Sequence, residues 1–236
     1  MTELNPTALS VVIPAYNEAE SLPSLHAEIV AACEHGLDGT PLDFEIIIVD
    51  DGSTDDTTQV CAGLSPLRYI HLEHNSGQTA ALNRGLHEAR GQFVAALDGD
   101  GQNDPADIPG MLAYLKAHEE LDCVCGWRVR RQDKLSRRIA SQGAYLLRQL
   151  VLHDGVHDSG CTLKVFRRAC LEGLELTSDQ HRFIPALLIA HGYRVGEMPV
   201  NHRPRTHGTS KYGPGRMANG LRDLFAIRAF VRKGRA

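Results

Sequence analysis

Two aspartates separated by one glycine, Asp98 and Asp100, form the segment of this sequence whose chemistry is easiest to specify. In extended backbone, residues two apart point to the same side, so both carboxylates can face one ion. Carboxylates without a neighbouring His or Cys suit a hard divalent cation, Mg²⁺ or Mn²⁺. Gln102 can add an oxygen ligand, and Gly99 lets a ligand approach the backbone. The segment predicts a divalent-cation site, with a solvated acidic turn as the alternative.

Two further polar segments also follow apolar runs. Residues 14–18 come after the run at 9–13, and residues 50–55 come after the run at 44–49. Asp, Gly, Ser and Asn favour turns for local reasons, so each segment alone has an ordinary explanation. In open α/β sheets, however, ligands bind outside the carboxyl ends of the strands. Three polar strand ends in one sheet therefore predict a shared cleft.

The elements that would position these segments alternate between short β-rich runs and helical patterns. This alternation predicts an α/β fold with a mostly parallel central sheet flanked by helices. The expected strands lie at residues 9–13, 44–49, 68–72, 93–97, 162–166 and 195–200. The expected helices cover about 18–35, 54 onward, 76–90 with Ser76 as its cap, 105–118, 134–152, 179–191 and 216–233.

Composition excludes several classes of protein. The chain has 236 residues, 42% hydrophobic and 23% charged, so it can bury a sizeable core and is not disordered. No run approaches the ~18 apolar residues of a membrane span, and the N-terminal sequence does not resemble a secretory signal. The six cysteines lack C-x-x-C spacing, which favours reduced, buried thiols over disulfides or a zinc site. We therefore expect a cytoplasmic protein.

The net charge of −4 conceals a division between two halves of the chain. Residues 1–125 hold four basic against 21 acidic side chains, whereas residues 126–236 hold 21 basic against eight acidic ones. An asymmetry of this size suggests different partners for the two halves. No linker, repeat or low-complexity tract separates them, so we expect a single domain over residues 1–236.

Four motifs make the sequence resemble the family 2 glycosyltransferases, and within them the polyprenyl- and dolichyl-phosphate sugar transferases. The motifs are Ile13-Pro-Ala-Tyr-Asn-Glu18, Val49-Asp-Asp-Gly-Ser53, Asp98-Gly-Asp-Gly-Gln102 and His207-Gly-Thr-Ser-Lys-Tyr212. The resemblance implies the GT-A fold, a nucleotide-diphosphate sugar donor, Mg²⁺ or Mn²⁺, a polyprenyl-phosphate acceptor and inversion at the anomeric carbon. Residues 1–125 would then bind nucleotide and metal, and residues 126–236 the acceptor.

The resemblance also implies roles for individual residues. Asp98, Asp100 and Gln102 would hold the metal, and Asp100, Arg205 and Lys211 would act in catalysis by neutralising the leaving diphosphate. The implied nucleotide-sugar-binding residues are Pro14, Tyr16, Glu18, Val49, Asp50, Asp51, Asp98, Gly99, Asp100, Gln102, Arg128, Arg205 and Lys211. The loop that carries the last two is rich in glycine, a composition expected of a mobile lid.

On the acceptor side, the resemblance implies that a basic run after residue 129 meets the lipid phosphate. The implied contacts are Arg131, Arg137, Arg138 and Ser141, and a solvated helix face is the alternative. A phosphate monoester has its second pKa near 6 and needs no base, whereas a hydroxyl acceptor does. Asp158 matches an acidic family position and is the candidate catalytic base. The basic, amphipathic 216–233 helix would either lie on an anionic bilayer or pack onto the domain.

Two other functions compete with sugar transfer to a polyprenyl phosphate. One keeps the donor chemistry but uses a glycan or another lipid hydroxyl as acceptor. The other is a non-catalytic module whose basic half binds nucleic acid or anionic lipid. The combination of Asp98, Asp100, Arg205 and Lys211 argues against a pure binding module, which needs no metal and diphosphate site. We therefore expect no nucleic-acid partner, and peripheral contact with the inner face of the membrane.

Overall fold

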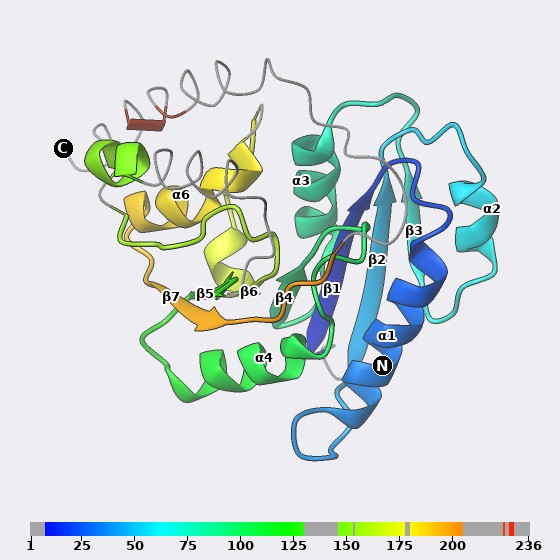
Figure 1. Ribbon diagram of the computed structural model, residues 1–236, viewed down its shortest axis with the longest axis horizontal. Helices are drawn as coiled ribbons and strands as arrows, with labels where there is room; N and C mark the ends of the chain where they lie inside the picture. The colour runs from blue at the N-terminus through cyan, green and yellow to red at the C-terminus, as the bar shows by residue number, and fades with distance from the viewer. Residues whose placement is uncertain are drawn as a thin grey trace, which may run out of the picture.

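A seven-stranded sheet runs through the part of the chain that the computed structural model describes, which is residues 8–129, 146–152, 154–177, 180–204, 224, 227 and 228 (Figure 1). The strand order is β3-β2-β1-β4-β6-β5-β7. In chain order the strands are β1 (Leu9–Ala15), β2 (Phe44–Asp50), β3 (Arg68–His71), β4 (Phe93–Ala96), β5 (Cys123–Trp127), β6 (Lys164–Arg167) and β7 (Val195–Pro199).

All of these strands except β6 run parallel to one another. β6 pairs in antiparallel fashion with β4 on one side and β5 on the other. Every residue of β1 and β4 is buried, which explains why both strands read as apolar runs. Only Ser10 interrupts the run in β1, and its hydroxyl donates to Glu45 Oε1 (2.6 Å). The mostly parallel α/β sheet predicted from the sequence is confirmed.

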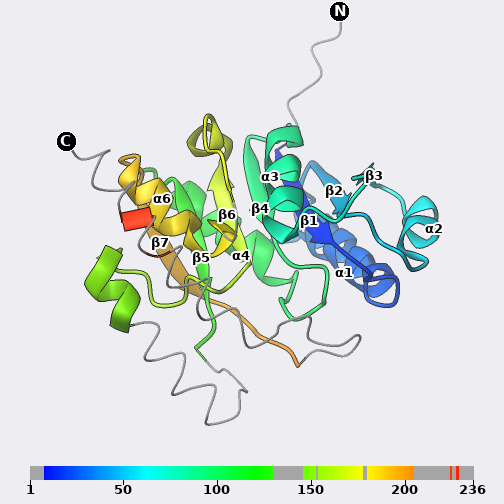
Figure 2. The ribbon, with the colours of Figure 1, turned by 90° about the horizontal axis from the view of Figure 1, so that it is seen from above.

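Helices cover both faces of the sheet (Figure 2). α1 (Leu22–His35), α2 (Thr57–Ala62) and α4 (Asp107–Ala117) pack on one face with Val11 and Ile13. The opposite face, with Val12, is covered by α3 (Gln78–Glu88), α6 (Ile184–Ala190) and the 3₁₀ turns η1 (Arg168–Leu171) and η2 (Gln180–Phe183). The six cysteines are buried with free thiols within these layers, as predicted.

α1 and α2 begin later than the sequence pattern indicates, and hydrogen bonds between the loops after β1 and β2 accompany both changes. α1 begins at Leu22 instead of residue 18, and the backbone nitrogens of Glu18 and Ala19 donate to Thr57 Oγ1 (3.1 Å) and Asp55 Oδ2 (3.2 Å). Asn17, just before them, has a left-handed backbone (φ 51°). The Asn17 Oδ1 atom accepts hydrogen bonds from the backbone nitrogens of Thr54 (2.7 Å) and Asp55 (3.3 Å). These bonds hold residues 54 and 55 outside α2, which begins at Thr57. They also fasten the end of β1 to the end of β2.

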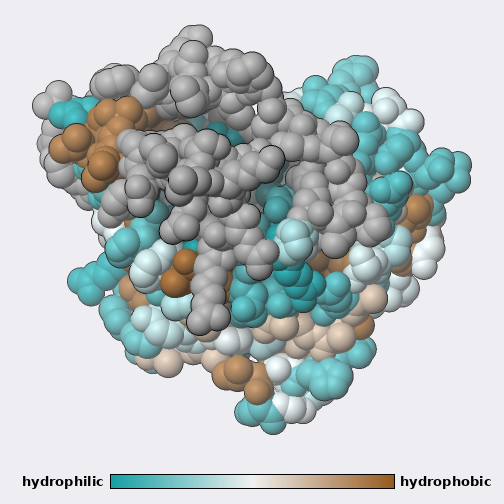
Figure 3. Space-filling view, viewed as in Figure 1, coloured by the Kyte–Doolittle hydropathy of each residue, from teal (hydrophilic) through white to brown (hydrophobic). Residues whose placement is uncertain are grey.

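The helices expected in the second half differ more from the structure. The predicted helix at 179–191 is divided into η2 and α6, with Pro185 in the first turn of α6, where its missing N–H costs nothing. Of the basic stretch at 134–152, only residues 146–152 are described, and they are helical. Leu146 and Leu150 are 60% and 70% exposed on that helix. Figure 3 shows a hydrophobic patch at the place that this helix occupies in Figure 1.

The terminal helix at 216–233 falls almost entirely outside the described residues. Leu224 and Ile227 are helical and buried in the core on the α3 side, and Arg228 donates a hydrogen bond to the Val151 carbonyl (3.0 Å). These contacts favour packing onto the domain over the bilayer alternative at these positions. In the described ranges, no helix is both long enough and apolar enough to span a membrane.

Candidate active site

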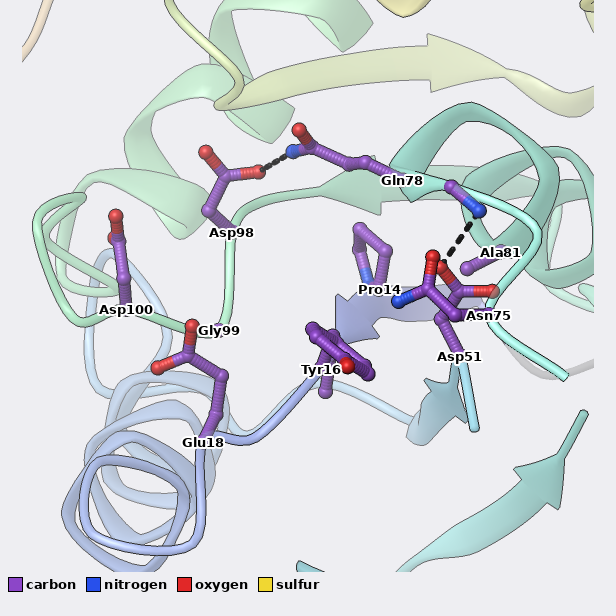
Figure 4. Close-up of a pocket in the computed structure, with 12 residues that line it drawn as sticks. Pro14, Tyr16, Glu18, Asp51, Asn75, Gln78, Ala81, Asp98, Gly99 and Asp100 are labelled. Atoms are coloured by element: carbon purple, nitrogen blue, oxygen red, sulfur yellow. Dashed lines mark hydrogen bonds between the residues drawn. The ribbon is translucent and has the colours of Figure 1, made fainter. Parts of the chain in front are cut away.

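A pocket of about 190 Å³ lies beyond the carboxyl ends of β1, β2 and β4 (Figure 4). Seven predicted nucleotide-sugar residues line it, contributed by all three predicted strand ends: Pro14, Tyr16, Glu18, Asp51, Asp98, Gly99 and Asp100. The remaining lining residues are Ala15, Asn75, Gly77, Gln78 and Ala81. The structure therefore brings together the three segments that the strand-end rule predicted to converge.

Asp51 forms one end of the pocket, and the backbone just before α3 holds its carboxylate in place. Its two carboxylate oxygens accept hydrogen bonds from the backbone nitrogens of Ser76 (2.7 Å) and Gly77 (2.8 Å). Gly77 has a left-handed backbone (φ 94°) and occupies the N-cap position of α3, so Ser76 does not cap this helix as predicted. The Asp51 carboxylate therefore fixes the two residues that precede α3, which begins at Gln78.

Asp50 and Val49 are predicted nucleotide-sugar residues that do not line the pocket. Val49 is fully buried in the core on the α3 side of the sheet. The Asp50 carboxylate, also fully buried, accepts hydrogen bonds from the Ser53 hydroxyl (2.5 Å), the Tyr69 hydroxyl (2.5 Å) and His71 Nδ1 (3.2 Å). In this arrangement Asp50 holds the loop after β2 to strand β3, and its binding role stays a prediction.

Asp98 and Asp100 form the other end of the pocket (Figure 4). Asp98 Oδ1 accepts a hydrogen bond from Gln78 Nε2 (2.6 Å), and Asp100 Oδ1 accepts one from the Gln102 backbone nitrogen (3.1 Å). Burial and the neighbouring Asp100 carboxylate raise the pKa of Asp98 to about 6. A cation bound here would favour the ionised form of Asp98, which burial and the neighbouring carboxylate disfavour.

The donor set at this end fits a hard divalent cation. Its side chains offer carboxylate oxygens, and the pocket lining includes no His or Cys. Within the described ranges, no three His, Cys, Asp or Glu side chains converge into a complete metal site. Mg²⁺ commonly binds one or two protein carboxylates and completes its shell with water and phosphate oxygens. Asp98 and Asp100 therefore suit a metal that arrives with a diphosphate.

Gln102, the third predicted metal ligand, does not line the pocket. Its side-chain Nε2 atom lies 3.5 Å from the Arg203 backbone carbonyl oxygen. The Gln102 backbone carbonyl accepts a hydrogen bond from the Arg203 backbone N–H (2.9 Å). Gln102 thus joins the loop after β4 to the segment after β7. Its role as a ligand stays a prediction.

Arg128 and Asp158 form an ion pair outside the pocket lining. The Arg128 Nε and Nη2 atoms donate to the two Asp158 carboxylate oxygens at 2.7 and 2.8 Å, and both side chains are largely buried. The Arg128 charge also acts to lower the pKa of Asp98, although burial outweighs it. The Asp158 carboxylate thus accepts hydrogen bonds from Arg128 on both of its oxygens, and its role as a catalytic base stays a prediction.

The remaining predicted residues lie outside the described part of the chain. They are Arg205 and Lys211 of the glycine-rich loop and the acceptor-phosphate residues Arg131, Arg137, Arg138 and Ser141.

Sequence reasoning missed Asn75 and Gln78, which line the pocket. Asn75 lies in the turn before α3, and Gln78 is the first residue of that helix. The strand-end rule could have found both, because the turn after β3 lies at the same carboxyl edge as the other three. The sequence His74-Asn-Ser-Gly77 instead resembles an ordinary helix start. Gln78 reaches from α3 to Asp98, so it connects the two ends of the pocket (Figure 4).

Comparisons of sequence extend over most of the chain. A family model described as "Glycosyl transferase family 2" matches residues 10–174. A dodecaprenyl-phosphate galacturonate synthase of Rhizobium johnstonii is 41% identical over 233 residues, covering 95% of this chain and 67% of that protein. An undecaprenyl-phosphate 4-deoxy-4-formamido-L-arabinose transferase of Pseudomonas fluorescens is 37% identical over 221 residues, covering 92% and 63%. The chain thus spans about two thirds of the length of these curated relatives.

Comparisons of structure agree on the fold. A glucosyl-3-phosphoglycerate synthase of Mycobacterium tuberculosis, solved with Mn²⁺, UDP and glucosyl-3-phosphoglycerate, superposes with a TM-score of 0.72 at 20% identity over 95% of this chain and 80% of that one. The same enzyme with Mg²⁺ and UDP gives a TM-score of 0.72 at 19% identity, covering 95% and 79%. At such identities the likeness establishes the fold alone, and it confirms the predicted GT-A type.

Proposed function

Because the chain belongs to glycosyl transferase family 2, we propose that it moves a sugar from a nucleotide-diphosphate donor to a polyprenyl phosphate, with inversion at the anomeric carbon. The observation that carries this proposal is the pocket at the carboxyl edge of the sheet. It has Asp51 at one end and the Asp98–Asp100 pair at the other. A nucleotide diphosphate has its nucleoside at one end and its phosphates at the other. Asp51 would serve as the polar group for the nucleoside, and the Asp98–Asp100 pair as the cation site for the phosphates.

On the donor side, Asp98 and Asp100 would hold Mg²⁺ or Mn²⁺, which when bound supplies positive charge beside the diphosphate leaving group. Tyr16 lines the pocket between its two ends, and Glu18 lines it beside Gly99 at the Asp98–Asp100 end, where both would contact the nucleotide (Figure 4). Arg205 and Lys211 are proposed as additional cations for the diphosphate. Together these positive charges would stabilise the diphosphate, on which negative charge develops as its bond to the sugar breaks.

On the acceptor side, a phosphate oxygen of the lipid would attack the anomeric carbon while the bond to the donor's β-phosphate oxygen breaks. The bonding electrons leave with the nucleoside diphosphate. A phosphate monoester is already largely dianionic at pH 7, so this attack needs no protein base. Both relatives named above act in polyprenyl-phosphate chemistry.

We place the acceptor end against the inner face of the cytoplasmic membrane. Arg131, Arg137, Arg138 and Ser141 are proposed to contact the lipid phosphate. The helix at 146–152, which follows them in the chain, exposes Leu146 and Leu150 (Figure 3). Exposed apolar side chains next to a basic run suit the boundary between lipid head groups and acyl chains.

A transfer assay with paired acceptors tests the proposal. The purified chain would be incubated with Mn²⁺ and radiolabelled UDP-, GDP- or dTDP-sugars, together with either undecaprenyl phosphate or undecaprenol in detergent. We expect labelled lipid from at least one donor with the phosphate only, and a loss of about 100-fold or more in Asp100→Asn. Transfer to undecaprenol at a similar rate would favour the hydroxyl alternative. No lipid product from any donor would contradict the proposal.

A further inference from the structure

One hydrogen bond joins the first residue of α3 to the Asp98–Asp100 pair. The Gln78 Nε2 atom donates to Asp98 Oδ1 at 2.6 Å, and both residues line the pocket (Figure 4). An ionised carboxylate can only accept hydrogen bonds, and the amide nitrogen of glutamine can only donate them, so the direction of this bond is fixed. Hydrogen bonds to an ionised group are also stronger than those between neutral groups. The Gln78 amide therefore restrains one oxygen of the Asp98 carboxylate.

The start of α3 presents this amide from a fixed backbone. The two residues that precede Gln78 donate their N–H groups to the Asp51 carboxylate at the other end of the pocket (2.7 and 2.8 Å). The residue that follows it, Thr79, is buried, and its hydroxyl forms a hydrogen bond of 2.7 Å with His181 Nδ1 on η2. Gln78 thus lies between two anchored neighbours, and its side chain reaches Asp98 from a defined position.

The backbone of the loop after β4 has supports of its own. The Ser21 hydroxyl on the α1 side donates to the Gly99 carbonyl (2.7 Å) in a buried position. Asp100 Oδ1 accepts the Gln102 backbone N–H within the same loop (3.1 Å). Neither bond involves the Asp98 carboxylate. Loss of the α3 amide should therefore release the Asp98 side chain while the loop itself stays in place.

An amide is chemically suited to orient a carboxylate that binds a cation. A lysine or arginine at position 78 could also donate to Asp98, but its positive charge would repel a cation a few ångströms away. The glutamine amide orients the carboxylate without adding charge. It also leaves the full negative charge of Asp98 and Asp100 available to the cation.

We propose that Gln78 is a positioning residue that holds the Asp98 carboxylate, from the start of α3, in the orientation that binds a divalent cation. This inference rests on the proposed function, which places that cation at Asp98 and Asp100. Partners that orient a metal ligand commonly change metal affinity by about 10- to 100-fold when they are removed. Gln78 touches Asp98 and not the cation in this role.

The test is Mn²⁺ affinity, measured from the electron paramagnetic resonance signal of free Mn²⁺ with UDP, GDP or dTDP present and each nucleotide alone as the blank. Gln78→Leu keeps the approximate size of the side chain and removes the amide, so we expect the Mn²⁺ dissociation constant to rise by about 10- to 100-fold. Gln78→Asn keeps an amide that is one methylene too short to reach Asp98, and we expect a similar rise. It also serves alone if the leucine variant fails to fold, as judged by circular dichroism.

Gln59→Leu is the matched control. Gln59 is exposed on α2 and does not line the pocket, so the same substitution there should leave Mn²⁺ affinity unchanged. In sugar transfer, we expect saturating Mn²⁺ to restore most of kcat in Gln78→Leu, because the defect lies in holding the cation. A kcat that stays low at saturating Mn²⁺ would contradict a role in positioning Asp98 for the cation.

The outcomes separate this inference from the proposed function. A wild type that binds Mn²⁺ with none of the three nucleotides, or an Asp100→Asn variant that binds it as tightly as the wild type, would overturn the metal assignment itself. Normal Mn²⁺ affinity in folded Gln78→Leu or Gln78→Asn, with Asp100→Asn impaired, would overturn only the role of Gln78, even if the melting temperature had fallen.

Discussion

At the scale of single residues, Asp50 and Asp51 show how adjacent carboxylates acquire opposite properties. Burial raises the pKa of Asp50, but hydrogen bonds from Ser53, Tyr69 and His71 outweigh burial and hold it below the ordinary value. For Asp51, burial outweighs the hydrogen bonds from Ser76 and Gly77, and its pKa lies above the ordinary value. Strand alternation sends the two side chains to different surroundings, one into a polar network and one to the pocket.

These opposite shifts predict opposite pH dependences of stability. The stabilisation from Asp50 is present above the unfolded-state pKa of about 3.9 and is lost as the pH falls through the lower folded-state pKa. Asp50→Asn should lower the free energy of unfolding by about 1–3 kcal/mol near neutral pH, because buried donors lose their acceptor. This deficit in unfolding free energy relative to the wild type should shrink between about pH 5 and pH 3. Urea unfolding at a series of pH values measures the deficit.

Asp51→Asn provides the matched comparison. Because the folded-state pKa of Asp51 is raised, its contribution to stability is greatest below the unfolded-state pKa and is lost as the pH rises. The deficit of Asp51→Asn relative to the wild type should therefore grow over the same fall in pH. Deficits that change in the same direction for both variants would contradict the assignment of these two environments.

At the scale of elements, a glycine in α3 allows this helix to pack closely against the sheet. Gly85 lies where α3 crosses β1 and β2, and a Cβ atom there would lie 2.4 Å from Val12 Cγ1 and 3.1 Å from Val49 Cγ2. A glycine is thus required for the contact. Because the same helix carries Gln78 and follows Gly77, this contact also sets the position of one wall of the pocket.

Gly85→Ala should destabilise the protein by roughly 1–3 kcal/mol, because the added methyl group must push the helix or the valines apart. Gly110→Ala in α4 is the control, since its Cβ would meet only Met198 Cε at 3.4 Å. There the better helix propensity of alanine, up to about 1 kcal/mol, should leave stability equal or higher. Urea unfolding of the two variants compares them. If Gly85→Ala were as stable as Gly110→Ala, the packing of α3 against β1 would not require a glycine at position 85.

Much of this arrangement could be predicted from the sequence because it depends on local pattern. Apolar runs revealed the buried strands apart from β5, which was not among the expected strands, and the rule about carboxyl ends revealed Asp51, Asp98 and Asp100. Contacts that join distant segments left no such pattern. Gln78 was hidden in an ordinary helix start, and its hydrogen bond to Asp98 joins α3 to the loop after β4. Hydrogen bonds between the loops after β1 and β2 likewise accompany the later starts of α1 and α2.

At the scale of the whole molecule, the two charge halves contribute strands to the same sheet. β4 from the acidic half pairs with β6 from the basic half. Arg203 from the basic half forms ion pairs with Glu28 on α1 (2.5 Å) and Asp104 before α4 (2.7 Å). The four acidic residues that line the pocket all come from the first half: Glu18, Asp51, Asp98 and Asp100. The division of charge thus matches the proposed separation of a metal and nucleoside side from a phosphate side.

The central claim is that the pocket binds a nucleotide-diphosphate sugar through a cation on Asp98 and Asp100. The most direct measurement is the melting temperature of the wild type with UDP-, GDP- and dTDP-sugars, in Mn²⁺ and in EDTA. A ligand at about 100 times its dissociation constant stabilises the fold by about 2.7 kcal/mol, which corresponds to roughly 5–10 °C for a chain of this size. We predict such a rise for at least one donor in Mn²⁺, and its loss in EDTA and in Asp100→Asn. A rise of equal size in EDTA or in Asp100→Asn would contradict the claim.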